Sequence, residues 1–326
     1  MVKNKLVDYA KGFSILAIVM YHLIYYFLNV PNLIKIGANF GGAGVHVFLM
    51  CSGFGLYYSY LKHPLTFTEF ITKRFKKIYI PYIVIILISF LIPVMYVEKD
   101  RLLALLSHIF LFKMFIPRFD NSFGVQMWFI STIIQFYLIF LPLCQMKEKI
   151  GNKRFIILSI TISLVWAVLV SIIGKSDIRV WNSFFAQYLW EFSIGMLLGE
   201  YFKNNQKEFI TQINYIFLIS TFFASFIIYA FMALKGGPLK VFNDVFSAMA
   251  FGSFLVIMYK LNFFKSIFFW INKFSYELYL IHMLVFTISF KILIVFIPNT
   301  LTGVISLVIA IMCAIMCAII MKKIRL

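Results

Sequence analysis

Three histidines inside apolar segments are the side chains of this chain that are best suited to acid–base chemistry. His22 lies just past the middle of the first apolar segment, His46 opens the second, and His282 lies in the ninth. An imidazole exchanges a proton near neutral pH, and ionisable groups at membrane depth are rare and commonly functional. A hydrogen bond between helices is the alternative interpretation of each histidine. His22 is our first candidate for a general base, followed by His282 and then His46.

Polar side chains follow two helical faces toward these histidines. Lys11 and His22 are 11 residues apart, close to three turns at 3.6 residues per turn, and Asp8 lies nearly in line with them. On the ninth apolar segment, the spacing i, i+4, i+7 gives one shared face to Ser275, Tyr279 and His282. A polar stripe that rises from the inner membrane surface to an imidazole predicts the wall of a pore or of an active-site shaft.

The loop 62–81 carries a dense run of cations, Lys73-Arg74-Phe75-Lys76-Lys77. Clustered Arg and Lys side chains bind phosphates well, so Arg74, Lys76 and Lys77 are candidates for a cytoplasmic phosphate site. The excess of positive charge that cytoplasmic loops ordinarily carry explains the same run without any ligand.

Two further residues are candidates for contact with a substrate. Glu191 lies in the middle of the sixth apolar segment, where it is either the structural partner of a cation or a site residue. Trp128 lies near the outer boundary of the fourth segment, a position at which aromatic residues commonly mark the membrane interface. Gly195 and Gly199 follow Glu191 at a spacing of four residues, which permits close helix packing.

The elements that must position these residues are membrane-spanning helices. Of the 326 residues, 63% are hydrophobic and only 13% are charged, and the mean hydropathy is +0.94. Soluble domains carry about 25% charged residues, so hydrocarbon must be the solvent for most of this chain. We expect one all-α domain over residues 1–326, a polytopic transmembrane helix bundle. Apolar stretches of about 20 residues predict about ten spans, at 13–30, 44–61, 78–96, 125–145, 155–173, 184–202, 213–233, 241–259, 267–289 and 301–321.

The distribution of basic residues predicts the orientation of the bundle. With a cytoplasmic N-terminus, 20 of the 30 Lys and Arg residues fall in inside loops. This bias indicates that both termini are cytoplasmic and that the number of spans is even. The shorter apolar stretch 102–116 is therefore expected to lie along the interface rather than to cross. In this orientation His22, His46 and His282 lie at similar depth in the outer half.

Charge and cysteine content exclude other classes of protein. The net charge is +18, but the cations lie in short runs between apolar segments, a pattern that suits anionic lipid headgroups and argues against nucleic acid. The four cysteines form no CxxC or Cys/His spacing, so we expect no metal site. No cleavable signal peptide is expected, because no small-residue cleavage site follows the first apolar segment.

Six short motifs occur in order along the chain. They are Asp8–Gly12 with Tyr21-His22; Gly44–Phe54; Arg74–Tyr82; Trp128-Phe129 with Gln135–Tyr137 and Pro142; Glu191-Phe192 with Gly195; and Ser275, Tyr279 and His282. Together they resemble the membrane acyltransferase-3 family, the O-acyltransferases of bacterial surface polysaccharides and related acceptors. The resemblance covers residues 8 to 282.

The resemblance implies an enzyme of the bacterial cytoplasmic membrane. It would move an acyl group, most simply acetyl, from cytoplasmic acyl-CoA to a hydroxyl of an extracytoplasmic carbohydrate or cell-envelope acceptor. Arg74, Lys76 and Lys77 would hold the phosphates of CoA, and His22 would act as general base. Asp8 would position Lys11, while His282 and Tyr279 would orient the acceptor or stabilise the developing oxyanion. Direct transfer and an acyl-histidine intermediate are both open.

Departures from the family pattern affect several of these residues. Lys11 and Lys77 stand where many members have Arg, which keeps the charge but loses the bidentate geometry. His46 stands where Asp is common, and Ile133 and Ile134 replace a Glu pair, so no catalytic role is assigned there. The extracytoplasmic esterase-like domain of many members is absent, so a stand-alone form is expected.

A transporter or flippase for a polysaccharide or lipid-linked sugar is the alternative function. A polar shaft suits transport as well, and intramembrane His and Glu residues can relay protons. The basic loop separates the two hypotheses, because an acyl-CoA enzyme needs an inner phosphate site and a flippase does not. The sequence indicates neither the acceptor nor the oligomeric state.

Overall fold

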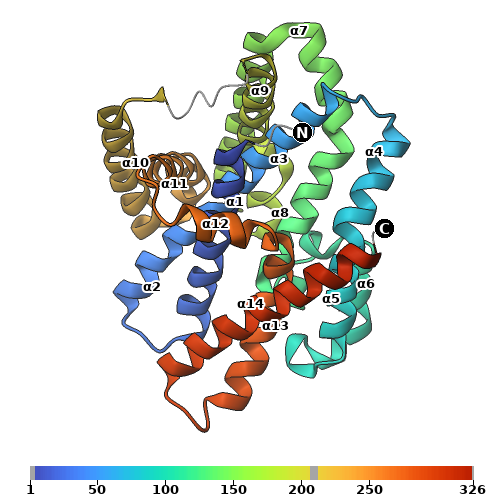
Figure 1. Cartoon of the computed structure of the whole chain (residues 1–326), viewed down its shortest axis with the longest axis vertical. Coiled ribbons are helices and arrows are strands. Elements are labelled where there is room, and N and C mark those ends of the chain that lie inside the picture. The colour runs from blue at the N-terminus through green and yellow to red at the C-terminus, as the bar shows by residue number, and fades with distance from the viewer. Residues whose placement is uncertain (1–3, 206–211, 325–326) are drawn as a thin grey trace.

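The computed structural model describes residues 4–205 and 212–324, and the regular elements in these ranges are all helical. The predicted all-α fold class is therefore confirmed (Figure 1). The α-helices are α1 (Lys5–His22), α2 (Asn32–Ala38), α3 (Gly44–Tyr60), α4 (Phe67–Arg74), α5 (Ile80–Phe90), α6 (Arg101–Ile109), α7 (Trp128–Ile172), α8 (Arg179–Asn182), α9 (Leu189–Asn205), α10 (Tyr215–Lys235), α11 (Asn243–Lys260), α12 (Lys265–Asn272), α13 (Ser275–Leu293) and α14 (Asn299–Ile324).

Short helical segments of other types connect them. Two are π-helical, η1 (Leu23–Phe27) and η3 (Phe75–Tyr79). The 3₁₀ segments are η2 (Asn39–Ala43), η4 (Pro93–Met95), η5 (Glu98–Asp100), η6 (Lys113–Phe115), η7 (Pro117–Phe119), η8 (Val125–Met127), η9 (Phe185–Tyr188) and η11 (Gly237–Phe242).

Seven helices of the described ranges are long and apolar enough to cross a membrane, which indicates a multi-pass membrane protein. The predicted count of ten spans is not confirmed. The predicted span 78–96 contains the end of η3, the 11-residue α5 and η4, and α5 continues directly from α4 and η3. The predicted span 184–202 corresponds to α9, which has 17 residues. The predicted spans 125–145 and 155–173 both belong to α7.

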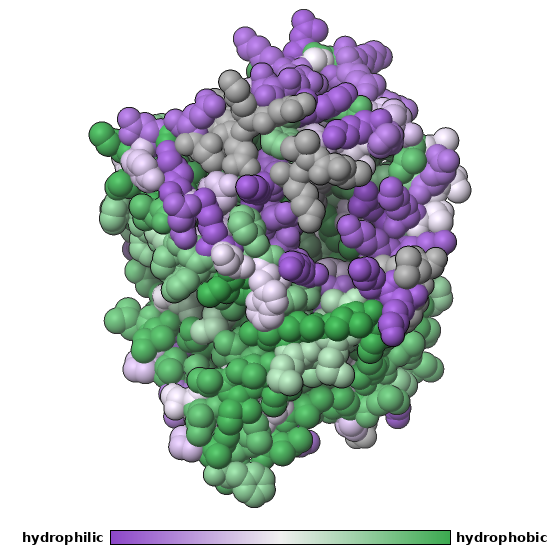
Figure 2. Space-filling view, in the orientation of Figure 1, coloured by the Kyte–Doolittle hydropathy of each residue, from purple (hydrophilic) through white to green (hydrophobic). Residues whose placement is uncertain are grey.

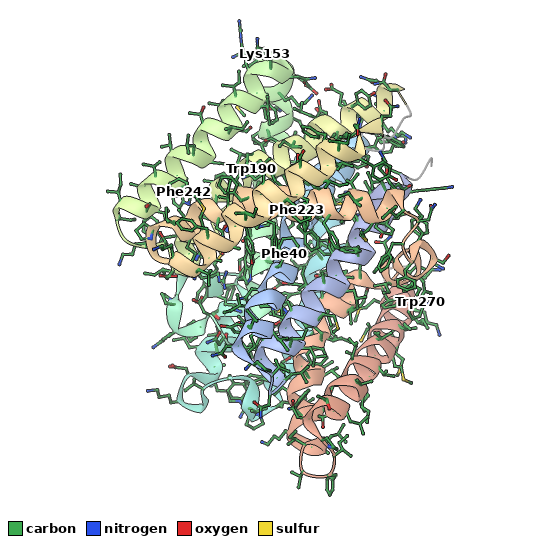
Figure 3. All side chains as sticks on the ribbon, turned by 90° about the vertical axis from the view of Figure 1, so that its left-hand side faces the viewer. Phe40, Lys153, Trp190, Phe223, Phe242 and Trp270 are labelled. Atoms are coloured by element: carbon green, nitrogen blue, oxygen red, sulfur yellow. The ribbon has the colours of Figure 1, made fainter. Side chains whose placement is uncertain are left out.

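α7 is one long element that folds back on itself. Its 45 residues would extend for about 67 Å if they were straight. Gly151 interrupts it with φ 77° and ψ 164°, a left-handed backbone that glycine adopts without strain. The resulting turn lies at the upper end of the molecule in Figure 1, and Lys153 lies at that extreme end in Figure 3. The two halves of α7 therefore account for two of the predicted spans.

Hydrophilic residues gather at the end of the molecule that contains this turn. The N-terminal end of α1 and the α3–α4 connection lie near it, whereas the α13–α14 connection lies at the opposite end (Figure 1). The space-filling surface is hydrophilic over the upper part of this face and hydrophobic below it (Figure 2). This arrangement brings basic loops predicted to be cytoplasmic to one end; that this end faces the cytoplasm stays a prediction.

Glycines allow the central helices to approach each other closely. α1 packs against α3, α12 and α13, and α3 packs against α9. A Cβ atom at Gly12 would overlap the Phe268 carbonyl of α12, and one at Gly53 would overlap the Phe192 carbonyl of α9. Gly195 and Gly199 of α9 face the backbone of α3 in the same way. The predicted close packing at these two glycines is present, and it fixes α3 against α9.

Aromatic rings connect the α10–α11 pair to this centre. The ring of Phe40 lies 5.1 Å from that of Phe226 in α10 and 5.6 Å from that of Phe251 in α11. Figure 3 shows Phe40 between these two helices and the central ones. Such pairs add about 0.5–1.5 kcal/mol each beyond the area that they bury.

α6 corresponds to the stretch 102–116 and is not among the seven candidate spans. It has nine residues, and one of its faces packs against the protein; that it lies along the membrane interface stays a prediction. His108 is fully buried, and its ring nitrogens lie 2.7 Å from the Tyr82 hydroxyl and 2.9 Å from the Ser122 hydroxyl. This polar network fixes α6 to α5 and to the segment that precedes α7.

Candidate active site

His22 and His282 form a buried pair between α1 and α13. The Nδ1 atom of His22 lies 2.8 Å from the Nε2 atom of His282. Their rings stack, with centroids 5.0 Å apart and an angle of 14° between the ring planes. The two histidines that the sequence placed at similar depth therefore meet directly, although they are 260 residues apart.

The hydrogen bonds of this pair determine which nitrogen of His22 is available. The Nδ1 atom of His282 lies 3.0 Å from the Leu278 carbonyl, which can only accept, so His282 carries its proton on Nδ1. Its Nε2 atom must then accept from the Nδ1–H of His22. The remaining lone pair of His22 is on Nε2, for which no hydrogen bond is found among the described residues. His22 is thus held in the tautomer that a general base needs.

Both π-helical segments of the described ranges follow directly after residues of chemical interest. α1 ends at His22 and continues as η1, and α4 ends at Arg74 and continues as η3. π segments are rare and frequently occur at functional sites, because they shift the face on which a side chain is presented. Sequence reasoning predicted neither segment.

A cavity of about 570 Å³ approaches the histidine pair from the basic end. Five cationic residues line it: Lys11, Lys73, Arg74, Lys77 and Lys273. Apolar and aromatic residues line its other part, among them Ile18, Val45, Phe48, Phe129 and Tyr279. Its volume is within the range of small-molecule sites, about 300–1,000 Å³. The predicted shaft therefore corresponds to a cavity with a basic part and an apolar part.

The apolar part of this cavity lies close to the histidines. Ile18 precedes His22 by four residues in α1, and Tyr279 precedes His282 by three in α13, so each lining residue is about one helical turn from its histidine. The Tyr279 hydroxyl donates a short hydrogen bond to the Gln126 carbonyl, and the Ser275 hydroxyl donates to the Asn272 carbonyl at 3.2 Å. The backbone thus engages the hydroxyl protons of both predicted substrate residues, although both residues line the cavity.

Arg74 is the best placed of the predicted phosphate ligands. It ends α4, whose start is fixed by a capping box between Thr66 and Glu69. Its guanidinium lies over the Phe70 ring, 5.4 Å from the centroid, and its buried Nε atom has no hydrogen-bond partner among the described residues. Lys77 lines the cavity beside it, whereas Lys76 is not among the lining residues, although both side chains are exposed.

Asp8 and Lys11 are not joined in the described structure by a hydrogen bond or an ion pair. Asp8 accepts instead from the side-chain amide of Asn272, at 3.0 Å, and thereby connects α1 to the end of α12. Lys11 lines the cavity. The described residues therefore do not show the contact by which Asp8 was predicted to position Lys11.

His46 and Glu191 form a second buried polar cluster, outside the cavity. His46 Nδ1 lies 2.8 Å from Glu191 Oε1, and His46 Nε2 lies 2.9 Å from the Ser247 hydroxyl. Ser247 lies 3.0 Å from the Asp244 carbonyl, and an Asp244 carboxylate oxygen is 3.9 Å from His46. His46 is thus the partner of the buried Glu191, and neither residue is brought to the His22 pair.

Arg179 and Trp128 lie together near the start of α7. The Arg179 guanidinium carbon is 4.9 Å from the centroid of the Trp128 ring, and Trp128 does not line the cavity. Sequence reasoning missed Arg179, because an isolated cation between two apolar segments resembles an ordinary loop charge. The stacked pair is visible only once the two halves of α7 fold back.

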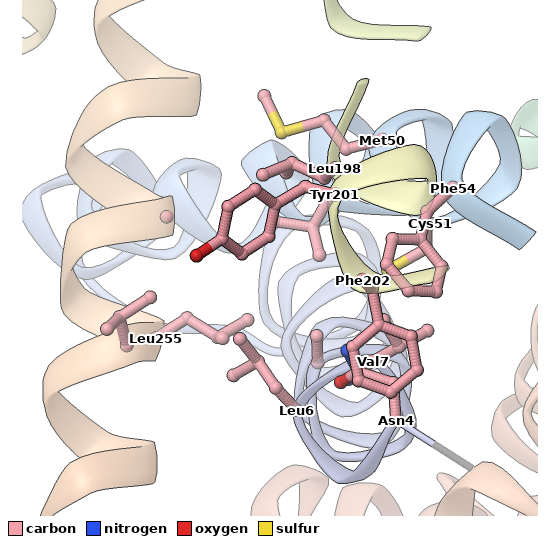
Figure 4. Close-up of a pocket in the computed structure, with 14 residues that line it drawn as sticks. Asn4, Leu6, Val7, Met50, Cys51, Phe54, Leu198, Tyr201, Phe202 and Leu255 are labelled. Atoms are coloured by element: carbon pink, nitrogen blue, oxygen red, sulfur yellow. The ribbon is translucent and has the colours of Figure 1, made fainter. Parts of the chain in front are cut away.

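A smaller apolar recess lies between α1, α3, α9 and α11 (Figure 4). Its volume is about 120 Å³, and its lining includes Leu6, Met50, Phe54 and Phe202. Cys51 borders both this recess and the larger cavity. No histidine or cationic side chain is among the residues that line the recess, so the larger cavity is the candidate active site. No cluster of His, Cys, Asp and Glu suited to a metal ion is found in the described ranges.

Comparison with protein families gives one match that spans almost the whole chain. Residues 4–321 match the family model described as an acyltransferase domain, acyltransferase-3. No curated protein and no solved structure matches the chain.

Proposed function

The chain belongs to the acyltransferase-3 family and is a membrane acyltransferase, and on that premise we propose its substrates and its mechanism. The donor is acyl-CoA, most simply acetyl-CoA, bound from the cytoplasmic side. The acceptor is a hydroxyl of a carbohydrate or other cell-envelope molecule on the outer side. The enzyme is an O-acyltransferase of the bacterial cytoplasmic membrane.

The observation that carries this proposal is the cavity with a basic part and an apolar part that approaches His22 and His282. Five cations at one part suit the phosphates of a CoA nucleotide, and the apolar part suits the arm that bears the thioester. The pair stands about one helical turn from that part, and the available Nε2 of His22 is the base that such a reaction requires. A transporter would need no phosphate site of this kind.

The transfer itself then needs one base and no net uptake or release of protons. His22 Nε2 takes the proton of the acceptor hydroxyl while the oxygen attacks the thioester carbonyl carbon. The resulting tetrahedral intermediate collapses by breaking its C–S bond. The CoA thiolate leaves with the proton that His22 had taken up, so the products are the ester and CoA thiol. His282 Nε2 accepts from His22 Nδ1–H throughout and stabilises the imidazolium that forms.

The test is equilibrium binding of acetyl-CoA to the full-length protein in detergent or nanodiscs. Arg74→Ala/Lys77→Ala should weaken binding by at least about tenfold, because hydrogen bonds to charged groups contribute about 1.5–3 kcal/mol each. Lys77→Ala alone should also weaken binding, and Lys76→Ala is its matched control, since it removes one charge of the same kind from the same run without touching the cavity. Binding to the wild type should also weaken as salt increases.

Two results would contradict the donor assignment. The absence of saturable binding at millimolar acetyl-CoA, with folded protein, would favour the transporter or flippase hypothesis or another acyl donor. An equal loss of affinity in Lys76→Ala would mean that the loop acts through its overall charge rather than through a site.

The role of His22 is tested with the same protein preparation. In an acyl-transfer assay, His22→Ala should lower the rate by about 10²–10⁴-fold, and in the binding assay it should leave acetyl-CoA binding intact.

A further inference from the structure

Arg179 is a partly buried cation with no carboxylate within ion-pair distance among the described residues. It opens α8, after the second half of α7, and therefore lies at the opposite end of that half from Lys153. Its hydrogen bond to the Ser183 hydroxyl is long, 3.4 Å, and no Asp or Glu oxygen of the described residues lies within 4.0 Å of it. The guanidinium carbon lies 4.9 Å from the centroid of the Trp128 ring, and a guanidinium has five N–H donors, one of which donates to Ser183.

The charge of Arg179 acts on His22 and on tyrosines next to it. It interacts electrostatically with His22 and with the neighbouring Tyr21 and Tyr26. The ring centroids of Tyr21 and Tyr26 lie 4.8 Å and 5.9 Å from the centroid of the His22 ring. Tyr26 and the adjacent Tyr25 have exposed side chains. Tyrosines combine an apolar ring with a hydroxyl, which suits contact with a polar, hydroxylated molecule.

A buried lysine lies beside Arg179. η6 packs against α8, and its Lys113 is fully buried, with its ammonium 3.1 Å from the Gly124 carbonyl. Burial lowers the pKa of Lys113 to about 7, although Asp120 acts in the opposite direction. Asp120 interacts with both side chains but forms an ion pair within 4.0 Å with neither of them, and its buried Oδ1 has no partner among the described residues. Among the described residues, Asp120 therefore leaves both Arg179 and Lys113 without a close ion pair.

We propose that Arg179, supported by Lys113, binds an oxyanion of the acceptor, a carboxylate or a phosphate, and so holds the acceptor with its hydroxyl at His22. The planar fork of Arg179 matches either group with two parallel hydrogen bonds. The acceptor class is then an acidic carbohydrate or a phosphate-bearing polyol rather than a neutral sugar. This inference rests on the proposed function, because it assigns the acceptor side of the same reaction.

The first test measures binding without acetyl-CoA. The protein used is the full-length Arg74→Ala/Lys77→Ala variant, which lacks the two candidate phosphate ligands of the inner side. Its thermal unfolding is measured with each of two acidic probes and a neutral counterpart of each: glucuronate with glucose, and glycerol 3-phosphate with glycerol. Each acidic probe that fits should raise the midpoint of unfolding and its neutral counterpart should not. Adding Arg179→Gln should abolish that shift. Adding Arg118→Gln should not, because Arg118 also stacks on a ring, Phe119, but has a carboxylate, Asp100, at 3.6 Å.

The outcomes separate the two oxyanions and decide the inference. A shift with glucuronate alone assigns a carboxylate, and a shift with glycerol 3-phosphate alone assigns a phosphate. Equal effects of acidic and neutral probes, no effect of any probe, or a shift retained in Arg179→Gln would overturn the proposal. Because this measurement needs no donor, failure of acetyl-CoA to bind would contradict the proposed function separately.

A second test uses turnover of the wild type with acetyl-CoA and the same four probes. The enzyme should release CoA from acetyl-CoA faster with an acidic probe as acceptor than with its neutral counterpart. Arg179→Gln should remove that preference, with a loss of at least about tenfold for the acidic probe, while the KM for acetyl-CoA is unchanged. An equal loss with neutral acceptors would assign Arg179 to the reacting carbonyl oxygen and overturn the proposal.

Discussion

Replacing His282 with phenylalanine removes the acceptor of the His22 Nδ1–H and keeps an aromatic ring of similar size in the buried site between α1 and α13. His22 then loses both the hydrogen bond that selects its tautomer and the partner that stabilises its imidazolium. A hydrogen bond to a charged group contributes about 1.5–3 kcal/mol, and each 1.36 kcal/mol is a factor of ten in rate. We therefore expect kcat to fall by about 10- to 150-fold.

The loss should appear in kcat rather than in the binding of the donor. His282 is fully buried and does not line the cavity, so the KM for acetyl-CoA should stay unchanged. His282→Gln is the matched variant, because its amide can donate to the Leu278 carbonyl and its oxygen can accept from His22. It should recover part of the activity. The assay is release of CoA thiol by the purified full-length enzyme with acetyl-CoA and an acceptor.

Three results would refute this reasoning. A kcat within about threefold of the wild type in His282→Phe would mean that His22 needs no partner. Equal losses in the Phe and Gln variants would mean that packing, not hydrogen bonding, is the role of His282. A large increase in KM with unchanged kcat would move His282 to donor binding.

Three further perturbations test the rest of the structure. Gly55→Phe places a ring in the larger cavity, where a Cβ at Gly55 meets no atom within 4 Å. Acetyl-CoA binding should be lost with little change in the unfolding midpoint. Normal binding would show that the donor does not occupy this cavity. His46→Leu leaves Glu191 as an unpaired buried carboxylate and should destabilise by about 3–5 kcal/mol in denaturant unfolding, most of which Glu191→Leu in the same chain should restore. Lys113→Met should be stabilising, and more so at pH 6.5 than at pH 9. The pKa of the buried amine is about 7 and that of the unfolded one is 10.5, so the stability of the wild type rises between these pH values by up to about 1.4 kcal/mol per pH unit. A difference in unfolding midpoint that does not depend on pH would contradict this prediction.

The sequence contained enough information to predict the depth of the histidines but not their contacts. Hydropathy and basic loops place His22 and His282 at similar depth, because each helix can be oriented by itself. Their contact depends on which helices are neighbours, and this is decided by close approaches such as Gly12 of α1 on Phe268 of α12. The same limit applies to His46 and Glu191, whose pairing needs the α3–α9 contact.

The count of ten spans stays unconfirmed, because hydropathy measures composition and not helix length. The segment 78–96 is apolar enough to span, but its helix α5 ends at Phe90, and Pro93 begins a separate 3₁₀ segment. In the basic run, charge alone gave Arg74, Lys76 and Lys77 equal weight. Helical spacing separates them in hindsight: Lys73 and Lys77 are four residues apart on one face and both line the cavity, while Lys76 does not.

The dimensions of α1 fit the reach of the proposed donor. Lys11, in the basic part of the cavity, and His22 are 11 residues apart in one helix, which corresponds to about 16 Å. The arm of CoA between phosphate and sulfur has about twelve bonds, and an extended chain advances about 3.3–3.6 Å for every three bonds, so the arm reaches about 14 Å. The acyl carbon and one hydrogen-bond length cover the remaining distance. Phosphates held among the cations would therefore bring the thioester to His22, and a negatively charged nucleotide need never enter the hydrocarbon, where its transfer would be costly.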